Sequence, residues 1–115
     1  MKTEDRDRGL LIRISEHCDR IGEARERFGD SLEAYLNDAD YRDVICMNIF
    51  QIGELSNQLS EDLRGKTADI PWHQMYGIRN ILAHAYIKID NRIVWQTVVK
   101  DIPQLKKLIE NLESI

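Results

Sequence analysis

Apolar residues recur along this chain with the spacing of an α-helix. In a first segment, from about Glu4 to Phe28, they return at steps of three, four and seven, which places them on one stripe of a helix. A second segment, from about Tyr41 to Leu59, has a wider apolar surface, so we expect it to be the central helix. The stripes are Leu11, Ile14, Cys18, Ile21 and Phe28 in the first segment, and Val44, Ile45, Ile49, Ile52, Leu55 and Leu59 in the second.

Two further helical segments follow in the second half of the chain. One begins near Pro71, because proline suits the first turn of a helix. The other runs from Asp90 to Leu112 and contains Pro103, which predicts a kink or a restart near Asp101. The apolar stripe of the third segment is Met75, Ile78, Leu82 and Ala85.

The connecting segments have no strand pattern and no internal repeat. Residues 31–36 predict a short turn of helix, and residues 63–69 predict a loop in which Gly65 can end a helix. The sequence therefore predicts an all-α fold: an up-and-down bundle of four main helices, with the last helix kinked at Pro103. We expect one domain over residues 1–115.

The composition is that of an ordinary soluble domain. Of the 115 residues, 43% are hydrophobic and 31% are charged. No apolar run approaches the roughly 20 residues of a membrane helix, and the charged N-terminal residues lack a signal-peptide core. We therefore expect a cytoplasmic protein with no membrane partner, in which Cys18 and Cys46 are reduced, buried thiols rather than a disulfide or a reactive site.

The net charge of −4 argues against broad electrostatic capture of nucleic acid. The charge is uneven, however, because residues 1–60 carry a balance of −5 and residues 61–115 a balance of +1. An anionic substrate is therefore expected to dock in the C-terminal half.

The third helical segment contains polar side chains that can take part in binding or catalysis. Arg79 can hold a phosphate with two hydrogen bonds, and His84 can move a proton near neutral pH. Asn80 and His84 lie four residues apart on one face of a helix, almost opposite the apolar stripe. Arg79 lies about 140° around the helix from His84. The two groups therefore converge poorly within one chain, unless the helix loosens, the substrate wraps around the helix, or a second subunit completes the site.

Cleavage of RNA through its own 2′-hydroxyl fits these groups. His84 suits the role of base or acid, and Arg79 suits stabilisation of charge on the phosphoryl oxygens. Asn80 could orient His84 or donate to the phosphate. This route requires no metal and no cofactor, and we assign neither. Structural roles are the alternative: Arg79 in a cap or a salt bridge, and His84 as a surface residue near a helix end.

The run Arg79-x-x-x-x-His84-x-Tyr86 resembles the R-x-x-x-x-H-x-Y motif of the HepT-like toxins, a branch of the HEPN superfamily. The similarity covers nearly the whole chain, since other segments resemble the family as well. These segments are 48–54, 70–72, 75–80, 94–95 and 101–105.

The resemblance implies a helical homodimer with a ribonuclease cleft at the subunit interface. It places Arg79 and His84 at the catalytic positions of the family. It also implies a partner, a minimal nucleotidyltransferase that acts as antitoxin and silences the toxin by transferring AMP to Tyr86. We therefore expect a metal-independent toxin ribonuclease whose partners are a second copy of the chain, RNA and this antitoxin.

Several alternatives remain open from the sequence. Without the family, Tyr86 reads as a half-buried anchor with its hydroxyl at the surface. Glu54 is expected to support the site by pairing with Arg79 if the second and third helices touch; otherwise it is a surface glutamate. The aromatic residues Trp72, Tyr76 and Trp95 are expected to be core or dimer contacts rather than platforms for bases. The competing function is a non-catalytic HEPN-like binding partner of a nucleotidyltransferase.

Overall fold

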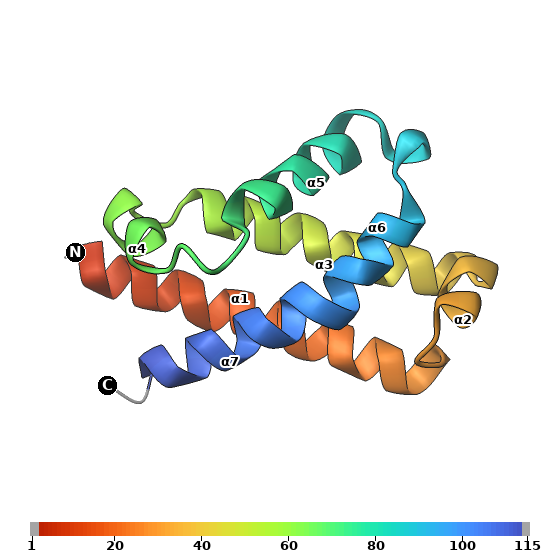
Figure 1. Cartoon of the computed structure of the whole chain (residues 1–115), viewed down its shortest axis with the longest axis horizontal. Coiled ribbons are helices and arrows are strands. Elements are labelled where there is room, and N and C mark those ends of the chain that lie inside the picture. Colours follow the sequence, from red (N-terminus) through yellow and green to blue (C-terminus); the bar gives the residue numbers. More distant parts are fainter. Residues whose placement is uncertain (1–2, 114–115) are drawn as a thin grey trace.

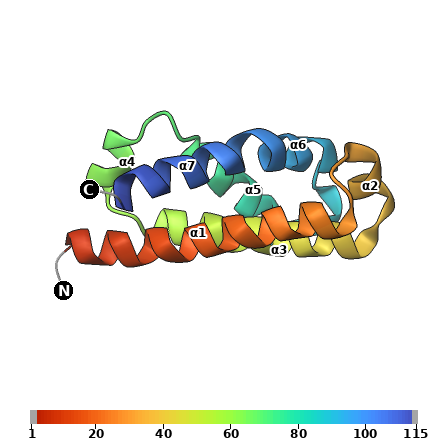
Figure 2. The same ribbon diagram turned by 90° about the horizontal axis from the view of Figure 1, so that it is seen from below.

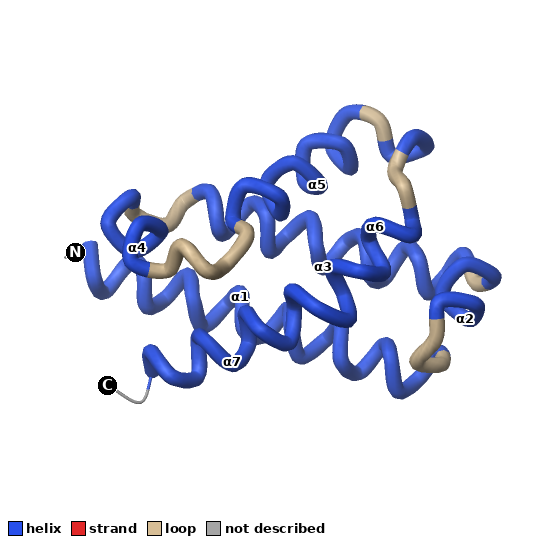
Figure 3. Tube along the Cα trace, in the orientation of Figure 1, coloured by secondary structure: helices blue, strands red, loops and turns tan. Residues whose placement is uncertain are grey.

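The computed structural model describes residues 3–113, and these form helices and loops without a strand (Figure 3). The long helices are α1 (Thr3–Phe28), α3 (Ala39–Asn57), α5 (Trp72–His84) and α7 (Ile102–Glu113), as the all-α prediction expects. Short elements connect them: α2 (Leu32–Asn37), α4 (Glu61–Lys66), a 3₁₀ turn η1 (Tyr86–Lys88), α6 (Asn91–Gln96) and a π-helical turn η2 (Thr97–Asp101). No helix in this part of the chain is long and apolar enough to cross a membrane.

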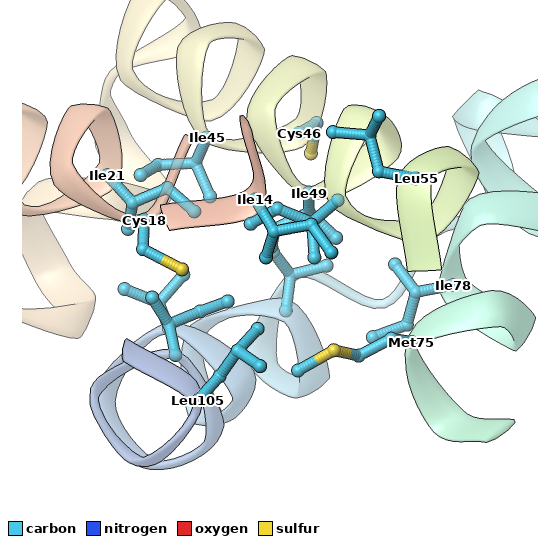
Figure 4. Packing of buried hydrophobic residues seen from close by; sticks show 14 of the residues in the cluster. Ile14, Cys18, Ile21, Ile45, Cys46, Ile49, Leu55, Met75, Ile78 and Leu105 are labelled. Carbon is cyan, nitrogen blue, oxygen red and sulfur yellow. The ribbon is translucent and has the colours of Figure 1, made fainter. Parts of the chain in front are cut away.

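The central element is α3, which packs against α1 on one side and α5 on the other (Figure 1). Figure 2 shows α6 and α7 lying across the layer that α1 and α3 form. Most residues of the predicted stripes meet in this core, where Ile14, Ile45 and Ile49 are almost completely buried (Figure 4). Val44 was also expected in the stripe of α3, but it is 37% exposed. From α5, Met75 and Ile78 complete the same core. The placement of α5 therefore follows from its apolar stripe, and its remaining faces are left for other contacts.

Local signals explain where several helices begin and end. Asp38 caps α3 by accepting hydrogen bonds from the backbone N–H groups of Asp40 and Tyr41, and Ser31 and Asp90 cap α2 and α6 in the same way. Gly29 ends α1 with a φ of 114°, a conformation that favours glycine.

The prediction of a loop over residues 63–69 is wrong in its first half, because α4 covers Glu61–Lys66. The hydroxyl of Ser60 caps this helix at Leu63, and it also donates to the carboxylate of Asp7 at 2.6 Å. A helix of six residues is too short for apolar periodicity to reveal, so only its cap was readable in the sequence.

The last helical segment is interrupted ahead of Pro103. Between α6 and α7 the backbone forms the π-helical turn Thr97–Asp101, which contains the expected restart point Asp101. The side-chain amide of Gln74, on α5, lies 3.4 Å from the Thr97 hydroxyl and 3.5 Å from the Asp101 carboxylate. The turn therefore also contacts α5. The kink of the helix axis at Pro103 stays a prediction.

Candidate functional site

A glycine allows α5 to approach α3 closely at the position of Arg79. A Cβ atom on Gly53 would lie 2.5 Å from the Arg79 Cβ, 3.0 Å from the Arg79 Cγ and 3.2 Å from the carbonyl oxygen of Met75. These distances are shorter than van der Waals contact, so an L side chain at position 53 would push the two helices apart. The absence of a side chain at Gly53 therefore sets how closely the Arg79 backbone and Cβ lie to α3.

The guanidinium of Arg79 is held by neighbours from both helices. Glu54 forms an ion pair with its Nε, and the Oδ1 of Asn80 accepts a hydrogen bond from its Nη1 at 2.9 Å. The ring centroids of Phe50 and Tyr76 lie 5.4 and 5.9 Å from its central carbon. Its side chain is 22% exposed. The group is therefore oriented, yet part of it still faces solvent where an anion can reach it.

His84 is the last residue of α5 and is exposed to solvent. The helix ends there because the backbone turns at Ala85, whose N–H still donates to the Ile81 carbonyl at 2.7 Å. No hydrogen bond or ion pair connects the imidazole to another residue in 3–113. The ring is therefore available to an external group, and it does not point toward Arg79 of its own chain, since α5 is helical over both residues.

Tyr86 begins the 3₁₀ turn after α5, with 44% of its surface exposed. Its hydroxyl donates a hydrogen bond of 2.6 Å to the carboxylate of Asp43 on α3. This hydrogen bond, aided by partial burial, raises the pKa of the Tyr86 phenol to about 12. The phenol is therefore protonated at neutral pH and is tied to α3 at the surface.

The predicted site residues are partly assembled. The pairing of Glu54 with Arg79 is present, because α3 and α5 do touch. Asn80 contacts Arg79 rather than His84, so the idea that it orients the imidazole does not describe this conformation. Among the residues that the structure describes, no group of three His, Cys, Asp or Glu side chains is arranged for a metal ion.

Sequence reasoning missed Gly53, Phe50 and Asp43 as neighbours of the site. A glycine inside a helical pattern can indicate close packing, so the position of Gly53 could have predicted this contact. Nothing in the sequence indicated the contact of Asp43 with Tyr86, because the two residues are 43 positions apart in the chain.

A comparison with protein families identifies the class of protein. A family model described as "Ribonuclease HepT-like" matches residues 14–112, a range that contains Glu54, Arg79, His84 and Tyr86. The chain therefore belongs to the HepT-like ribonuclease family.

Similar curated proteins have names of the same kind. The chain is 32% identical over 107 residues to the "Probable ribonuclease HepT" of Thermococcus cleftensis, covering 85% of this chain and 96% of that protein. It is 30% identical over 105 residues to a "Putative RNase" of Caldanaerobacter subterraneus subsp. tengcongensis, covering 91% and 92%. It is 37% identical over 76 residues to a "Putative RNase" of Methanocaldococcus jannaschii, covering 66% and 70%. No solved structure matches the chain.

Proposed function

We propose that this chain is a toxin endoribonuclease that cleaves RNA without a metal ion, through Arg79 and His84. The observation that carries the proposal is that Arg79 and His84 are both accessible to solvent in a chain of the HepT-like ribonuclease family. Arg79 is oriented by Glu54 and Asn80 with part of its surface free, and His84 is exposed five residues further along the same helix.

In the proposed reaction the 2′-hydroxyl of the substrate is the nucleophile. The His84 imidazole accepts the 2′-hydroxyl proton, the 2′-oxygen bonds to the adjacent phosphorus, and the bond from phosphorus to the 5′-oxygen breaks. The 5′-oxygen leaves as a hydroxyl after it gains a proton from water. Arg79 stabilises the negative charge that grows on the phosphoryl oxygens. The products are a 2′,3′-cyclic phosphate and a 5′-hydroxyl.

A homodimer is proposed because one chain does not bring these groups together. Apolar side chains are exposed on α3 and around the end of α5, where Met47 is 60% and Ile87 is 96% exposed. Burial of such a surface against a second copy is favourable, and a two-fold axis beside α5 would bring Arg79 of one chain toward His84 of the other.

The proposed regulator is a nucleotidyltransferase antitoxin that transfers AMP to Tyr86. The phenolic oxygen would bond to the α-phosphorus of ATP, the bond from that phosphorus to pyrophosphate would break, and the phenolic proton would be lost. The exposure of Tyr86 supports access by such an enzyme. Tyr86 lines the same hollow as Phe50, whose ring lies beside the Arg79 guanidinium, so the added phosphate would bring negative charge to the Arg79 side of the site and compete with RNA.

A non-catalytic role remains the second candidate, because Glu54 already neutralises Arg79 and the chain has a net charge of −4. In that role the chain would only bind a nucleotidyltransferase.

Incubation of the purified protein with RNA in excess EDTA tests the catalytic proposal. Wild type should cleave and leave cyclic phosphate ends, while Arg79→Ala and His84→Ala should lose at least about 100-fold in rate. Both variants should stay folded, since neither side chain belongs to the apolar core. Cleavage that stops in EDTA and returns with a divalent ion would contradict the metal-independent route, and the absence of cleavage under all conditions would favour the binding role.

A further inference from the structure

The seam between α3 and α5 contains two hollows, with Arg79 between them. Phe50 lines one hollow and Tyr76 lines the other, and these are the two rings that flank the Arg79 guanidinium. A phosphate bound by Arg79 would therefore sit between two separate cavities. The Phe50 hollow, of about 500 Å³, is mainly apolar and is lined by Asp43, Cys46, Met47, Phe50, Leu82, Ala83 and Tyr86.

The Tyr76 hollow has a different chemistry and has no role in the function proposed above. It has a volume of about 410 Å³ and lies where the end of α3, the helix α4 and the start of α5 meet. Its walls combine aromatic rings with groups that form hydrogen bonds. They are Ser56, Asn57, Glu61, Arg64, Gly65, Trp72, His73 and Tyr76.

One cationic and one aromatic side chain of this hollow, Arg64 and Tyr76, are available to a ligand. Arg64 is half-exposed, and no residue within 3–113 pairs with its guanidinium. Tyr76 is half-buried and lines the cavity, and the Arg79 guanidinium lies over its ring. Trp72, by contrast, is fixed as part of the wall, since its indole N–H donates to the Thr67 hydroxyl at 3.0 Å.

These features match a nucleotide. A volume of this size is within the range of small-ligand sites. Planar bases stack on aromatic side chains, and arginine binds phosphate oxygens. The side chains of Asn57 and Glu61 can accept or donate hydrogen bonds at the edge of a base. Tyr76 precedes Arg79 by three residues, which is about 4.5 Å along the helix, so a nucleotide here would adjoin a phosphate on Arg79.

We propose that the Tyr76 hollow is a subsite for the nucleotide next to the scissile phosphate. The base stacks on Tyr76, and Arg64 binds the following phosphate. This inference rests on the proposed function, since it places the scissile phosphate at Arg79. It adds a second phosphate contact and a place where the identity of a base can be read.

Binding of an RNA that cannot be cleaved tests the subsite independently of catalysis. The probe is a fluorescent RNA hexamer of mixed sequence with 2′-fluoro sugars, which lacks the attacking hydroxyl, and the dissociation constant is measured by anisotropy. Arg64→Ala and Tyr76→Leu should each weaken binding about tenfold. Tyr76→Phe, which keeps the ring, and Arg13→Ala, which removes an exposed arginine from α1, should each stay within about twofold of wild type.

The salt dependence separates the two contacts. The slope of log affinity against log salt should fall by about one for Arg64→Ala and should not change for Tyr76→Leu. Circular dichroism checks that each variant is folded. If Tyr76→Leu does not fold, the test rests on Arg64→Ala, because Arg64 is half-exposed and its replacement should not disturb the fold.

The outcomes distinguish this inference from the proposed function. Equal losses for Arg64→Ala and Arg13→Ala would overturn the subsite, as would equal losses for Tyr76→Leu and Tyr76→Phe, or the absence of any binding. The expected binding pattern in a wild type that does not cleave unmodified RNA would support the subsite and contradict the catalytic proposal.

Discussion

Replacement of Gly53 by alanine tests whether the close contact between α3 and α5 positions Arg79. The new Cβ would lie 2.5 Å from the Arg79 Cβ and 3.2 Å from the Met75 carbonyl oxygen. An ordinary contact between carbon atoms is about 3.5–4.0 Å, so α5 must retreat by roughly 1 Å. Neither partner is the free end of a flexible side chain, which leaves movement of the helix as the response.

Two opposing effects set the size of the change in stability. Overpacking of this kind costs about 1–3 kcal/mol. Alanine in place of glycine inside a helix stabilises by about 1 kcal/mol. The free energy of unfolding should therefore fall by about 0–2 kcal/mol.

Gly22→Ala is the matched control, because Gly22 is also inside a helix but has no atom within 4 Å of the point that a Cβ would occupy. It should stabilise the protein by up to about 1 kcal/mol. The two variants should then differ by about 1–3 kcal/mol, or about 4–12 °C in melting temperature at equal protein concentration. Gly53→Ala should also lower the rate of RNA cleavage by about 10–100-fold, since a displacement of Arg79 by roughly 1 Å disturbs its geometry.

Thermal unfolding followed by circular dichroism, with the cleavage assay alongside, measures both quantities. If Gly53→Ala stabilises the protein as much as Gly22→Ala does and keeps full activity, the close approach of the helices has no role in placing Arg79.

Three further predictions concern the thiols and Tyr86. Burial raises the pKa of Cys18 to about 12 and also raises that of Cys46, so both thiols should resist alkylation at about pH 8 in the folded protein and react in denaturant, as mass spectrometry can follow. The Tyr86 phenol ionises at a higher pH in the folded state than in the unfolded state, so the free energy of unfolding should fall as the pH rises from about 10 to 12. That fall should be shallower in Tyr86→Phe, and a slope identical to that of wild type would refute the contribution of the hydrogen bond to Asp43. Tyr86→Phe should retain RNA cleavage and gain no AMP-sized mass when it is incubated with ATP and the cognate nucleotidyltransferase, whereas wild type should gain it.

The main helices could be predicted from the sequence because burial follows helical periodicity. The stripe that contains Ile14 and the stripe that contains Ile49 both form the core, and the stripe of Met75 and Ile78 places α5 on α3. The short helix α2 was predicted over residues 31–36, whereas the equally short α4 and the π-helical turn before Pro103 were not.

The candidate site was predictable only where its residues lie close in the sequence. Arg79, Asn80 and His84 share one helix, and their spacing alone showed that two of them point in different directions. The contacts of Arg79 with Glu54 and of Tyr86 with Asp43 depend on how two helices pack, so no local pattern contains them. The hollow beside Tyr76 depends in addition on α4, which the sequence did not reveal.

The central claim is that each ribonuclease site takes Arg79 from one chain and His84 from the other, so that a dimer has two equivalent sites, and mixed dimers test it most directly. Arg79→Ala and His84→Ala are unfolded together, refolded in equal amounts and assayed on RNA. If each site takes its arginine from one chain and its histidine from the other, half of the dimers are mixed and each has one intact site, so about a quarter of the wild-type activity should return. Mixed dimers as inactive as the separate variants, although mass spectrometry shows that they formed, would contradict a site shared in this way.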